Sequence, residues 1–441
     1  LQAATESSSR PALVTSEAQW TYAQLLDRVC ATAAAIRELC GSSPRRIAII
    51  GRNCPAHIVA LTAAHVVGAT VVVAHAAESR ERLVEILGRT APDLLVTDQA
   101  LPLQQLRLPP AVLTFADLEA GGSIFRDRPD LSAPRLTRQD VAMIVFTSGT
   151  SGRPKGVELT HGNFLFVVSR IREYLRLASS DRYALSLPLS HTYGLTVLLT
   201  TFAAGAAVAL PDNPAQPGSI LECLGHTCCT VFSGVPFHYE SFVRLGLLES
   251  AQLNHLRAVT SSGNRIAPDT VHRLEQALPF AEIFLMYGLT ESTTRSTYLP
   301  PELASSKPLS CGRPLRGVEI SIVGDGSRAA PVGQTGRVCI RGPNVMRGYF
   351  DDSVLTAMTL RDGWLDTGDV GYLDEDGCLF LVGRDLDMIK VAGERISSRE
   401  IEDCLASHPD IQDVAVIAVE REVFGEVPHA CLVLQSGQVS E

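Results

Sequence analysis

A segment rich in hydroxyl, glycine and basic side chains directly follows the apolar run Val141–Phe146. Its sequence is TSGTSGRPKG, made up of Thr147, Ser148, Gly149, Thr150, Ser151, Gly152, Arg153, Pro154, Lys155 and Gly156. In such a loop, backbone N–H and side-chain O–H groups converge on phosphate oxygens, and Lys155 supplies a positive charge to them. A flexible surface loop is disfavoured because a buried strand, a hydroxyl cluster and a lysine coincide. The spacing is not that of a Walker loop, which needs G-x-x-x-x-G-K-[ST].

Two further segments carry groups suited to a nucleotide. Met286–Glu291 reads MYGLTE, and its tyrosine offers an aromatic face to a purine while Glu291 offers a hard oxygen ligand for Mg²⁺. Asp366–Asp369 reads DTGD and offers a carboxylate to paired hydroxyls. Taken singly, each segment also fits an ordinary turn. The prediction that they bind a nucleotide therefore depends on their order along the chain after the first loop.

Together these segments resemble the adenylate-forming superfamily, which includes acyl- and aryl-CoA synthetases, luciferases and peptide-synthetase adenylation domains. The resemblance spans essentially the whole chain and is closest to the acyl- and aryl-CoA synthetases. It implies ATP and Mg²⁺ as cofactors, with Tyr287 stacked on adenine, Thr290 at the α-phosphate, Glu291 on the metal and Asp369 on the ribose. It also places the following residues at the nucleotide: Gly263, Asn264, Gly288 and Arg384.

The segment Pro188–Gly194, PLSHTYG, indicates the class of acid substrate, because it is similar to a P-L-x-H-x-x-G segment of acyl- and aryl-CoA synthetases. No aspartate for a substrate ammonium stands near it, so a fatty or aryl acid is favoured over an amino acid. His191 would orient the acyl group, whereas the alternative is a packing histidine. The expected walls of the acyl pocket are Tyr193, Val235, Phe237, His238, Ser262 and Gly263.

A second reaction follows from the same resemblance. The acyl adenylate would pass to a thiol, either coenzyme A or the phosphopantetheine of an acyl carrier protein, with Lys390 near that second site. Two alternatives remain open. One is an acyl-AMP ligase that loads only a carrier protein, and the other is a non-catalytic nucleotide-binding homologue.

Two departures from the family pattern are visible near the end of the chain. Leu386 stands where the family usually has Asp or Lys as a hinge. The family's adenylation lysine lies farther along the C-terminal domain than Glu441, so the chain is expected to end before it.

The elements that must position these residues indicate an α/β fold. Helix-like and strand-like segments alternate between Thr21 and Thr97, which is typical of parallel sheets in a layered domain. Short hairpin-like pieces follow from Val318, with turns such as Asp376–Gly377. We expect an adenylation domain over 1–384 that adds a distorted antiparallel β-barrel, then the start of a small mobile α+β domain over 385–441. The stretch Leu101–Pro134 lacks periodicity and is expected to be a surface connection.

Composition sets limits on the partners. The formal net charge of −10 and the absence of a basic run argue against nucleic acid. The 11 cysteines are scattered without metal-ligand spacing, which favours free thiols in the cytoplasm. The apolar runs Ile58–Ala74 and Leu195–Leu210 are short and broken by glycine, so each is expected to be a buried helix followed by a strand, not a membrane span. Gly324–Ala329 fits G-x-G-x-x-A, but Pro331 follows it, so a hairpin is favoured over a dinucleotide site.

Overall fold

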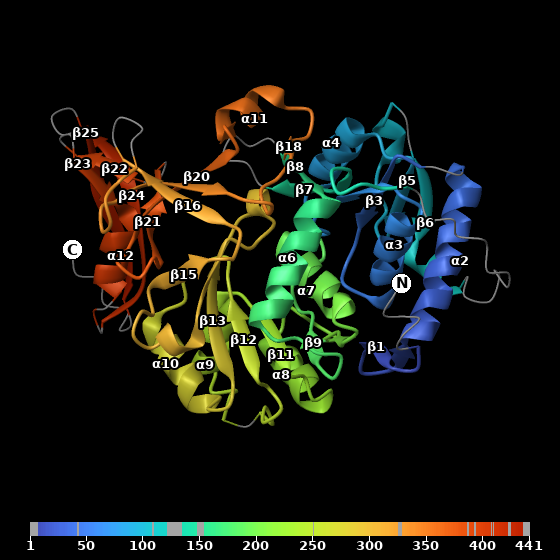
Figure 1. The fold of residues 1–441 in the computed structure, drawn as a ribbon, viewed down its shortest axis with the longest axis horizontal. Helices are drawn as coiled ribbons and strands as arrows, with labels where there is room; N and C mark the ends of the chain where they lie inside the picture. The colour runs from blue at the N-terminus through green and yellow to red at the C-terminus, as the bar shows by residue number, and fades with distance from the viewer. Residues whose placement is uncertain are drawn as a thin grey trace.

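The computed structural model describes residues 8–41, 44–107, 110–120, 135–147, 154–249, 251–324, 329–385, 388–391, 394–406, 408, 410–421 and 425–434. Their strands form three sheets, of seven, fourteen and four strands (Figure 1).

The seven-stranded sheet has the order β18-β8-β7-β4-β3-β5-β6. Its parallel strands are β3 (Arg46–Ile50), β4 (Thr70–Val73), β5 (Leu94–Thr97), β6 (Ala111–Thr114) and β7 (Val141–Thr147). The antiparallel strands β8 (Lys155–Thr160) and β18 (Gly348–Tyr349) complete one edge. The helices of this region are α2 (Tyr22–Cys40), α3 (Pro55–Val66), α4 (Arg80–Thr90) and α5 (Phe115–Ala120), with a 3₁₀ turn η1 (Leu103–Gln105).

The fourteen-stranded sheet is parallel in one half and antiparallel in the other. The parallel half contains β13 (Glu282–Tyr287), β12 (Ala258–Ser261), β11 (Val231–Gly234), β9 (Arg182–Ala184), β10 (Ala207–Ala209) and β1 (Pro11–Val14), with β2 (Gln19–Thr21) antiparallel at its edge. The antiparallel half contains β14 (Thr297–Leu299), β15 (Ser310–Pro314), β21 (Leu379–Arg384), β20 (Trp364–Leu373), β17 (Gly336–Arg341), β16 (Glu319–Val323) and β19 (Leu360–Arg361). These antiparallel strands are the ones expected to form a barrel, and they join the parallel half through the β13–β14 pair.

Helices fill the space between and outside these two sheets. They are α6 (His161–Tyr174), α7 (Thr192–Ala203), α8 (Pro217–His226), α9 (Pro236–Arg244), α10 (Pro268–Ala277) and α11 (Ser353–Thr359), with 3₁₀ turns η3 (Thr290–Ser292) and η4 (Pro301–Leu303). Figure 1 shows α6 and α7 between the two sheets. One hydrophobic core accordingly contains side chains of both sheets, such as Val71 and Met143 of the first and Val208 and Phe284 of the second.

The third sheet, at the C-terminal end of the molecule, has the order β23-β22-β25-β24 (Figure 1). Its elements are β22 (Met388–Val391), β23 (Glu394–Ser397), α12 (Ser398–Ala406), β24 (Ile411–Arg421) and β25 (Gly425–Leu434). Ser397 Oγ donates a hydrogen bond to the Val382 carbonyl oxygen of β21 at 2.8 Å, which ties this sheet to the large one.

Local sequence explains where several helices begin. Thr21 caps α2 by accepting a hydrogen bond from the Gln24 N–H, while the Gln24 side chain accepts one from the Thr21 N–H. Thr160 and Asn163 make the same reciprocal pair at the start of α6. The second of these caps fixes the helix that directly follows the β7–β8 hairpin.

The alternation of strands and helices predicted between Thr21 and Thr97 is confirmed, as is the hairpin turn at Asp376–Gly377. One prediction was wrong. Leu101–Pro134 is not only a surface connection, because it contains β6, which pairs with β5, and α5. β6 is a half-exposed edge strand with alternating burial, so it lacks the apolar run that marks the inner strands. Most of the Gly324–Ala329 turn, and Leu386, lie outside the described residues.

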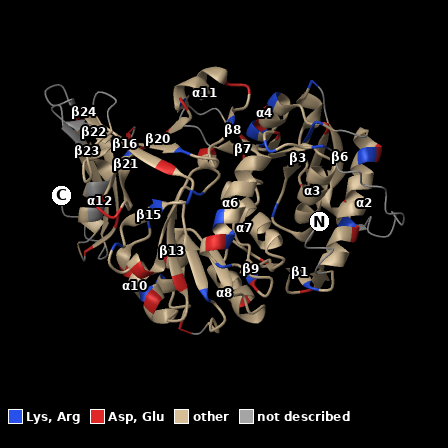
Figure 2. Cartoon of the chain, in the orientation of Figure 1, with Lys and Arg blue, Asp and Glu red and all other residues tan. Residues whose placement is uncertain are grey.

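The two apolar runs tested for membrane spans are α3 followed by β4, and α7 followed by β10, as expected. Over the described part of the chain, no helix has the length and apolarity needed to cross a bilayer. Figure 2 shows Lys and Arg interspersed with Asp and Glu along α2, α4 and α10.

Candidate active site

A cavity of about 1370 Å³ opens where the carboxyl ends of β11, β12 and β13 meet the start of α7 and the β7–β8 hairpin. It gathers most residues that the sequence predicted for the site. Those lining it are Thr147, Lys155, His191, Tyr193, Val235, His238, Ser262, Gly263, Asn264, Tyr287, Gly288, Thr290, Glu291, Asp369 and Arg384. Ser148, Gly149, Thr150, Ser151 and Gly152 lie outside the described residues. Lys390 is in β22, but its side chain is likewise not described.

Tyr287, Asp369 and Arg384 form one connected group at the end of the cavity nearest the antiparallel strands. Tyr287 is the last residue of β13, and its hydroxyl donates a 2.5 Å hydrogen bond to Asp369 Oδ2. Arg384 faces Asp369 across the β20–β21 pair, with Nε 3.2 Å from Oδ1. Burial raises the pKa of Asp369, and the Tyr287 hydrogen bond and the Arg384 charge act in the opposite direction. The group is a fixed carboxylate beside an aromatic ring, as a nucleoside requires.

The turn after β13 presents Thr290 and Glu291. Gly288 permits it, because a Cβ there would lie 2.2 Å from the Thr294 carbonyl oxygen. Thr293 and Thr294 follow in left-handed backbone conformations, with φ of 52° and 67°. Glu291 Oε1 accepts a 2.9 Å hydrogen bond from the Tyr349 hydroxyl, which fixes the carboxylate at the cavity wall.

The fit of this site to Mg²⁺ depends on Glu291. Among the described residues, no group of three His, Cys, Asp or Glu side chains is placed to hold a metal ion. A single oriented carboxylate suits a Mg²⁺ ion that takes its other ligands from phosphates and water. Glu291 can therefore be such a ligand, whereas an all-protein metal cage is not built here.

The β7–β8 hairpin brings the two ends of the predicted phosphate loop together. Thr147 and Lys155 are register partners across the hairpin, and both line the cavity. Lys155 Nζ lies 5.9 Å from the centroid of the Tyr349 ring, the same ring whose hydroxyl holds Glu291. Lys155 and Glu291 therefore come from different segments of the chain, and both contact the Tyr349 side chain at the cavity.

A pair of imidazoles lies at the start of α7. His191 immediately precedes the helix, and its ring centroid is 5.4 Å from that of His75. Burial lowers the pKa of His191, and the neighbouring His75 lowers it further. His75 Nδ1 accepts a 3.0 Å hydrogen bond from the Ala77 N–H, so in the neutral ring its proton is on Nε2. No sequence pattern indicated His75, because it enters the site only through the parallel pairing that positions β4.

His238 is a third imidazole in the wall. Its Nδ1 accepts a 3.2 Å hydrogen bond from the Val235 N–H, and burial lowers its pKa to about 4. The prediction that Phe237 lines the pocket was wrong, because its side chain is 60% exposed and lies outside the cavity lining. The His238 side chain folds back toward Val235, and the neighbouring position on α9 consequently faces solvent.

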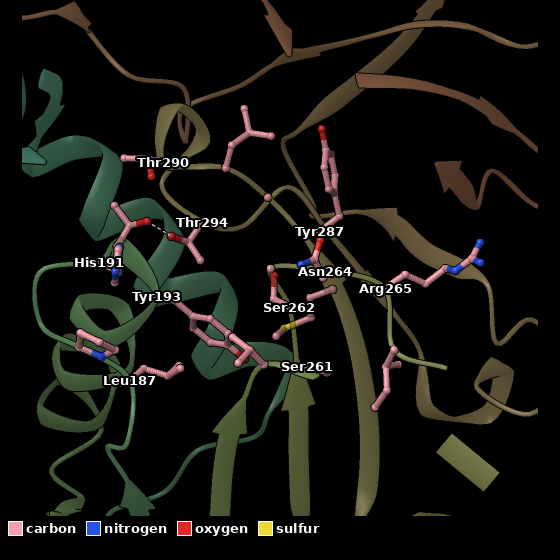
Figure 3. Close-up of a pocket in the computed structure, with 18 of the residues that line it drawn as sticks. Leu187, His191, Tyr193, Ser261, Ser262, Asn264, Arg265, Tyr287, Thr290 and Thr294 are labelled. Atoms are coloured by element: carbon pink, nitrogen blue, oxygen red, sulfur yellow. Dashed lines mark hydrogen bonds between the residues drawn. The ribbon is translucent and has the colours of Figure 1, made fainter. Parts of the chain in front are cut away.

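Tyr193, labelled in Figure 3, is bonded to a chain of buried hydroxyl groups behind the cavity wall. The Tyr193 hydroxyl lies 2.8 Å from Thr260 Oγ1, which in turn lies 2.7 Å from Ser233 Oγ. The Tyr183 hydroxyl extends the chain at 2.7 Å from Ser233 Oγ. These bonds fix the Tyr193 ring, so the wall of the pocket is rigid there.

Comparison with known proteins decides the family. Residues 1–350 match the model of the AMP-binding enzyme family, and residues 400–441 match that of the AMP-binding enzyme C-terminal domain. The chain belongs to the AMP-binding enzyme family.

Named members of this family align along almost the whole chain. A 2-succinylbenzoate–CoA ligase of Bacillus velezensis is 30% identical over 100% of this chain and 88% of its own. A feruloyl-CoA synthase of an Amycolatopsis species is 32% identical over 95% of this chain and 84% of its own.

The fold also matches solved AMP-binding enzymes. The o-succinylbenzoate CoA synthetase of Bacillus subtilis, in complex with its acyl-adenylate intermediate, superposes with a TM-score of 0.88 at 28% identity, covering 100% of this chain and 88% of that one. The same enzyme with ATP and magnesium gives a TM-score of 0.87 at 28% identity, covering 98% and 89%.

The cavity of this AMP-binding enzyme is also lined by residues that were not among the predicted site residues. Ser190 and Ser261 line it with buried hydroxyls that have no hydrogen-bond partner among the described residues. Arg265 lies in the wall next to Asn264, and Ser397, Ser398 and Glu402 reach the cavity from the C-terminal sheet and α12. Ser190 lies in the Pro188–Gly194 segment, and Ser261 and Arg265 flank the predicted residues 262–264, so these three have a sequence signal, whereas Ser397, Ser398 and Glu402 do not.

Proposed function

We propose that this chain activates an aryl carboxylic acid with ATP, forming an acyl adenylate and pyrophosphate, and then transfers the acyl group to the thiol of coenzyme A. The observation that carries the proposal is the single cavity shared by nucleotide-type and acyl-type residues. Tyr287, Asp369 and Glu291 line it together with His191 and Tyr193. The aryl class is favoured because the named relatives act on 2-succinylbenzoate and ferulate.

In the first reaction a carboxylate oxygen of the acid attacks the α-phosphorus of ATP. The bond between the α-phosphorus and the bridging oxygen breaks, and pyrophosphate leaves with the electron pair. Such a displacement needs alignment and charge neutralisation more than covalent help. Lys155 and the Thr147–Gly152 segment would neutralise the phosphates, and Thr290 would contact the α-phosphate.

The remaining contacts orient the nucleoside and the acid. Asp369 would accept hydrogen bonds from the ribose hydroxyls, with Gly263, Asn264, Gly288 and Arg384 beside the nucleotide and Tyr287 against the adenine. Mg²⁺, held through Glu291, would supply further charge neutralisation to the phosphates. His191, Val235, His238 and Ser262 would enclose the acyl group.

In the second reaction the thiol sulfur attacks the acyl carbon, AMP leaves, and the thiol proton is released. We assign residues 1–384 to the adenylation unit and 385–441 to the C-terminal unit, and by resemblance to the family we assign Lys390 to the thioester reaction. Phosphopantetheine of a carrier protein is the alternative acceptor, since it presents the same terminal thiol as coenzyme A.

The first test is acid-dependent ATP–pyrophosphate exchange with ferulate, 2-succinylbenzoate, octanoate and phenylalanine. We expect exchange with an aryl acid and its loss in a Lys155→Met variant, because that variant keeps the length of the side chain without its charge. ATP binding without any acid-dependent exchange would instead favour a non-catalytic nucleotide-binding homologue.

The second test separates the two thiol acceptors. Purified protein that makes acyl adenylate is given free coenzyme A or a phosphopantetheinylated carrier protein, and the thioester is measured by mass spectrometry. Thioester formation with coenzyme A supports the proposal. Formation only on the carrier protein would identify an acyl-AMP ligase.

A further inference from the structure

Arg295 is a fully enclosed cation just beyond the turn that carries Thr290 and Glu291. Its side chain is 1% exposed and is the largest of the fully buried side chains. A guanidinium stays protonated in a protein, so this position holds a full positive charge away from water. Burying a charge is unfavourable unless a partner compensates for it.

The described residues provide no acidic partner for this charge. None of their Asp or Glu side chains forms a salt bridge with Arg295. Arg257 is a useful contrast, because its guanidinium is bound to Asp181 through contacts of 2.9 Å and 2.7 Å. Both are arginines of the large sheet region, yet of these two only Arg257 has a carboxylate partner within the part of the chain that the structure describes.

The contacts of Arg295 are with neutral groups. Its Nε lies 3.3 Å from the Tyr174 hydroxyl, and its Nη1 donates to the Thr294 carbonyl oxygen at 3.2 Å. Its Cζ lies 4.3 Å from the centroid of the Tyr193 ring, a cation–π contact. These contacts orient the guanidinium without neutralising it.

Two of these contact residues form the acyl side of the cavity wall. Tyr193 and Thr294 both line the cavity, and Thr294 is also bonded to Thr192 at the start of α7 (Figure 3). The positive charge therefore lies one side chain behind this wall. A charge in a poorly hydrated interior acts across such a distance with little screening.

We propose that Arg295 is a positioning residue for the acid. The ionised carboxylate of the acid would supply, across the Tyr193–Thr294 wall, the counter-charge that Arg295 does not find among the described residues. The inference rests on the proposed function, because it requires that the cavity take an organic anion. Arg295 would not touch the substrate, but its charge would make the pocket bind an ionised acid more tightly than a neutral molecule of the same shape.

The test compares an acid with its neutral isostere. Dissociation constants of ferulate and ferulamide are measured by calorimetry at saturating AMP, for the wild type and for Arg295→Met and Arg295→Lys. We expect Arg295→Met to weaken ferulate binding about ten-fold and to leave ferulamide and AMP binding unchanged. Arg295→Lys, which retains the charge, should recover most of the ferulate affinity.

Stability supplies a second readout that a structural role would not give. An uncompensated buried charge costs free energy, and an apolar side chain of similar size removes that cost. We therefore expect Arg295→Met to keep or raise Tm. The matched variant Arg257→Met should lower Tm, because it leaves the Asp181 carboxylate, 5% exposed, without its partner.

Three outcomes would overturn the inference. Equal weakening of ferulate and ferulamide would mean that Arg295 only shapes the pocket. Unchanged ferulate binding in Arg295→Met would mean that its charge does not reach the acid. If the wild type bound neither ferulate nor 2-succinylbenzoate, the proposed function would fail together with the inference, and that result differs from the first two.

Discussion

The Asp369 side chain links Tyr287, at the end of the parallel strand β13, to Arg384, on the antiparallel strand β21. It is 6% exposed, and it holds both the Tyr287 hydroxyl and Arg384. A ribose that binds this carboxylate has to share it with, or take it from, those two partners. The hydrogen bonds gained must therefore exceed the ones already present, so we expect the site to prefer a ligand with two adjacent hydroxyls.

We expect Asp369→Asn to weaken AMP binding about 10- to 100-fold, because hydrogen bonds to a charged acceptor contribute roughly 1.5–3 kcal/mol. Calorimetry with AMP measures the effect. Asp366→Asn is the matched control: it lies on the same strand, pairs with Arg337 and is outside the cavity lining. Equal losses in the two variants would show that the strand, and not the Asp369 carboxylate, matters for binding.

At this scale the sequence predicted residues that lie in contiguous motifs and missed those brought in by folding. Tyr287, Glu291 and Asp369 stand in short segments whose chemistry can be read locally, and all three line the cavity. His75 and Arg295 stand in no such segment, since one follows a buried strand and the other a left-handed turn. Phe237 was predicted in the wall together with His238. That prediction failed because neighbouring side chains on a helix point in different directions.

Helix α3 illustrates a property that belongs to an element. His57 and His65 lie near its two ends, with His57 fully buried and His65 partly buried, and burial lowers the pKa of each to about 4. His57 Nδ1 lies 3.1 Å from the Arg52 carbonyl oxygen and must donate to it, which leaves its buried Nε2 without a partner among the described residues. Both imidazoles are therefore packed in the neutral form.

The stability of the protein should consequently fall below pH 6.5. The folded-state pKa of His57 is below the unfolded value of 6.5, so on acidification the unfolded chain takes up a proton before the folded chain does. Stability present above pH 6.5 is lost as pH falls toward 4. Between pH 7 and pH 5 the loss from His57 alone is about 2 kcal/mol, since each pH unit contributes about 1.4 kcal/mol.

We test this with His57→Asn, whose side-chain amide can still donate to the Arg52 carbonyl but does not titrate. Urea unfolding at pH 7 and pH 5 should show a pH difference smaller by about 2 kcal/mol in the variant than in the wild type. His272→Asn, at an exposed position on α10, is the control for loss of an imidazole. A pH difference unchanged in His57→Asn would show that this ring is protonated without opening the core.

Elements were predictable where periodicity and turn chemistry agreed. The strands β3, β4 and β5 are β-branched or leucine-rich runs, and all are buried parallel strands. β6 was missed because an edge strand with one solvated face resembles a loop in sequence. Sequence alone cannot identify such an edge strand, because the neighbouring strand with which it pairs determines which of its faces is buried.

At the scale of the whole molecule, the seven- and fourteen-stranded sheets share one hydrophobic core. The four-stranded C-terminal sheet has few buried apolar side chains among its described residues. Of the described side chains in β22–β25 and α12, the most buried apolar ones are Ile389, Val416 and Met388. Ile417, Leu432 and Val433 of β24 and β25 are about half exposed. The C-terminal sheet is therefore held mainly by backbone hydrogen bonds, and we expect it to open at a lower free energy than the rest.

Native-state hydrogen exchange checks this expectation. Amides of β24 and β25 should exchange at least about ten-fold faster than those of β11 and β12, whose residues are all buried. The β11 and β12 amides serve as the internal reference in the same sample. Equal protection across all four strands would show that the C-terminal sheet unfolds only together with the large domain.

The sequence predicted the class of the whole fold but not the way in which its sheets are joined. Alternating segments indicate parallel sheets, and the family resemblance implies an additional antiparallel region. The pairing of β13 with β14, which joins the parallel and antiparallel halves into one sheet, depends on a short return of the chain with no distinctive composition. Long-range pairing of this kind is decided by packing, so local patterns do not reveal it.

The placement of β1 has a consequence during synthesis on the ribosome. This strand lies near the beginning of the chain, yet its parallel partner is β10, with Leu13 opposite Val208 and Val14 opposite Ala209. At about 5–20 residues per second, the partner emerges roughly 10–40 s after β1 has been made. For that interval the apolar strand can pair only with the short strand β2, so the nascent chain should depend on a chaperone to shield it until β10 arrives.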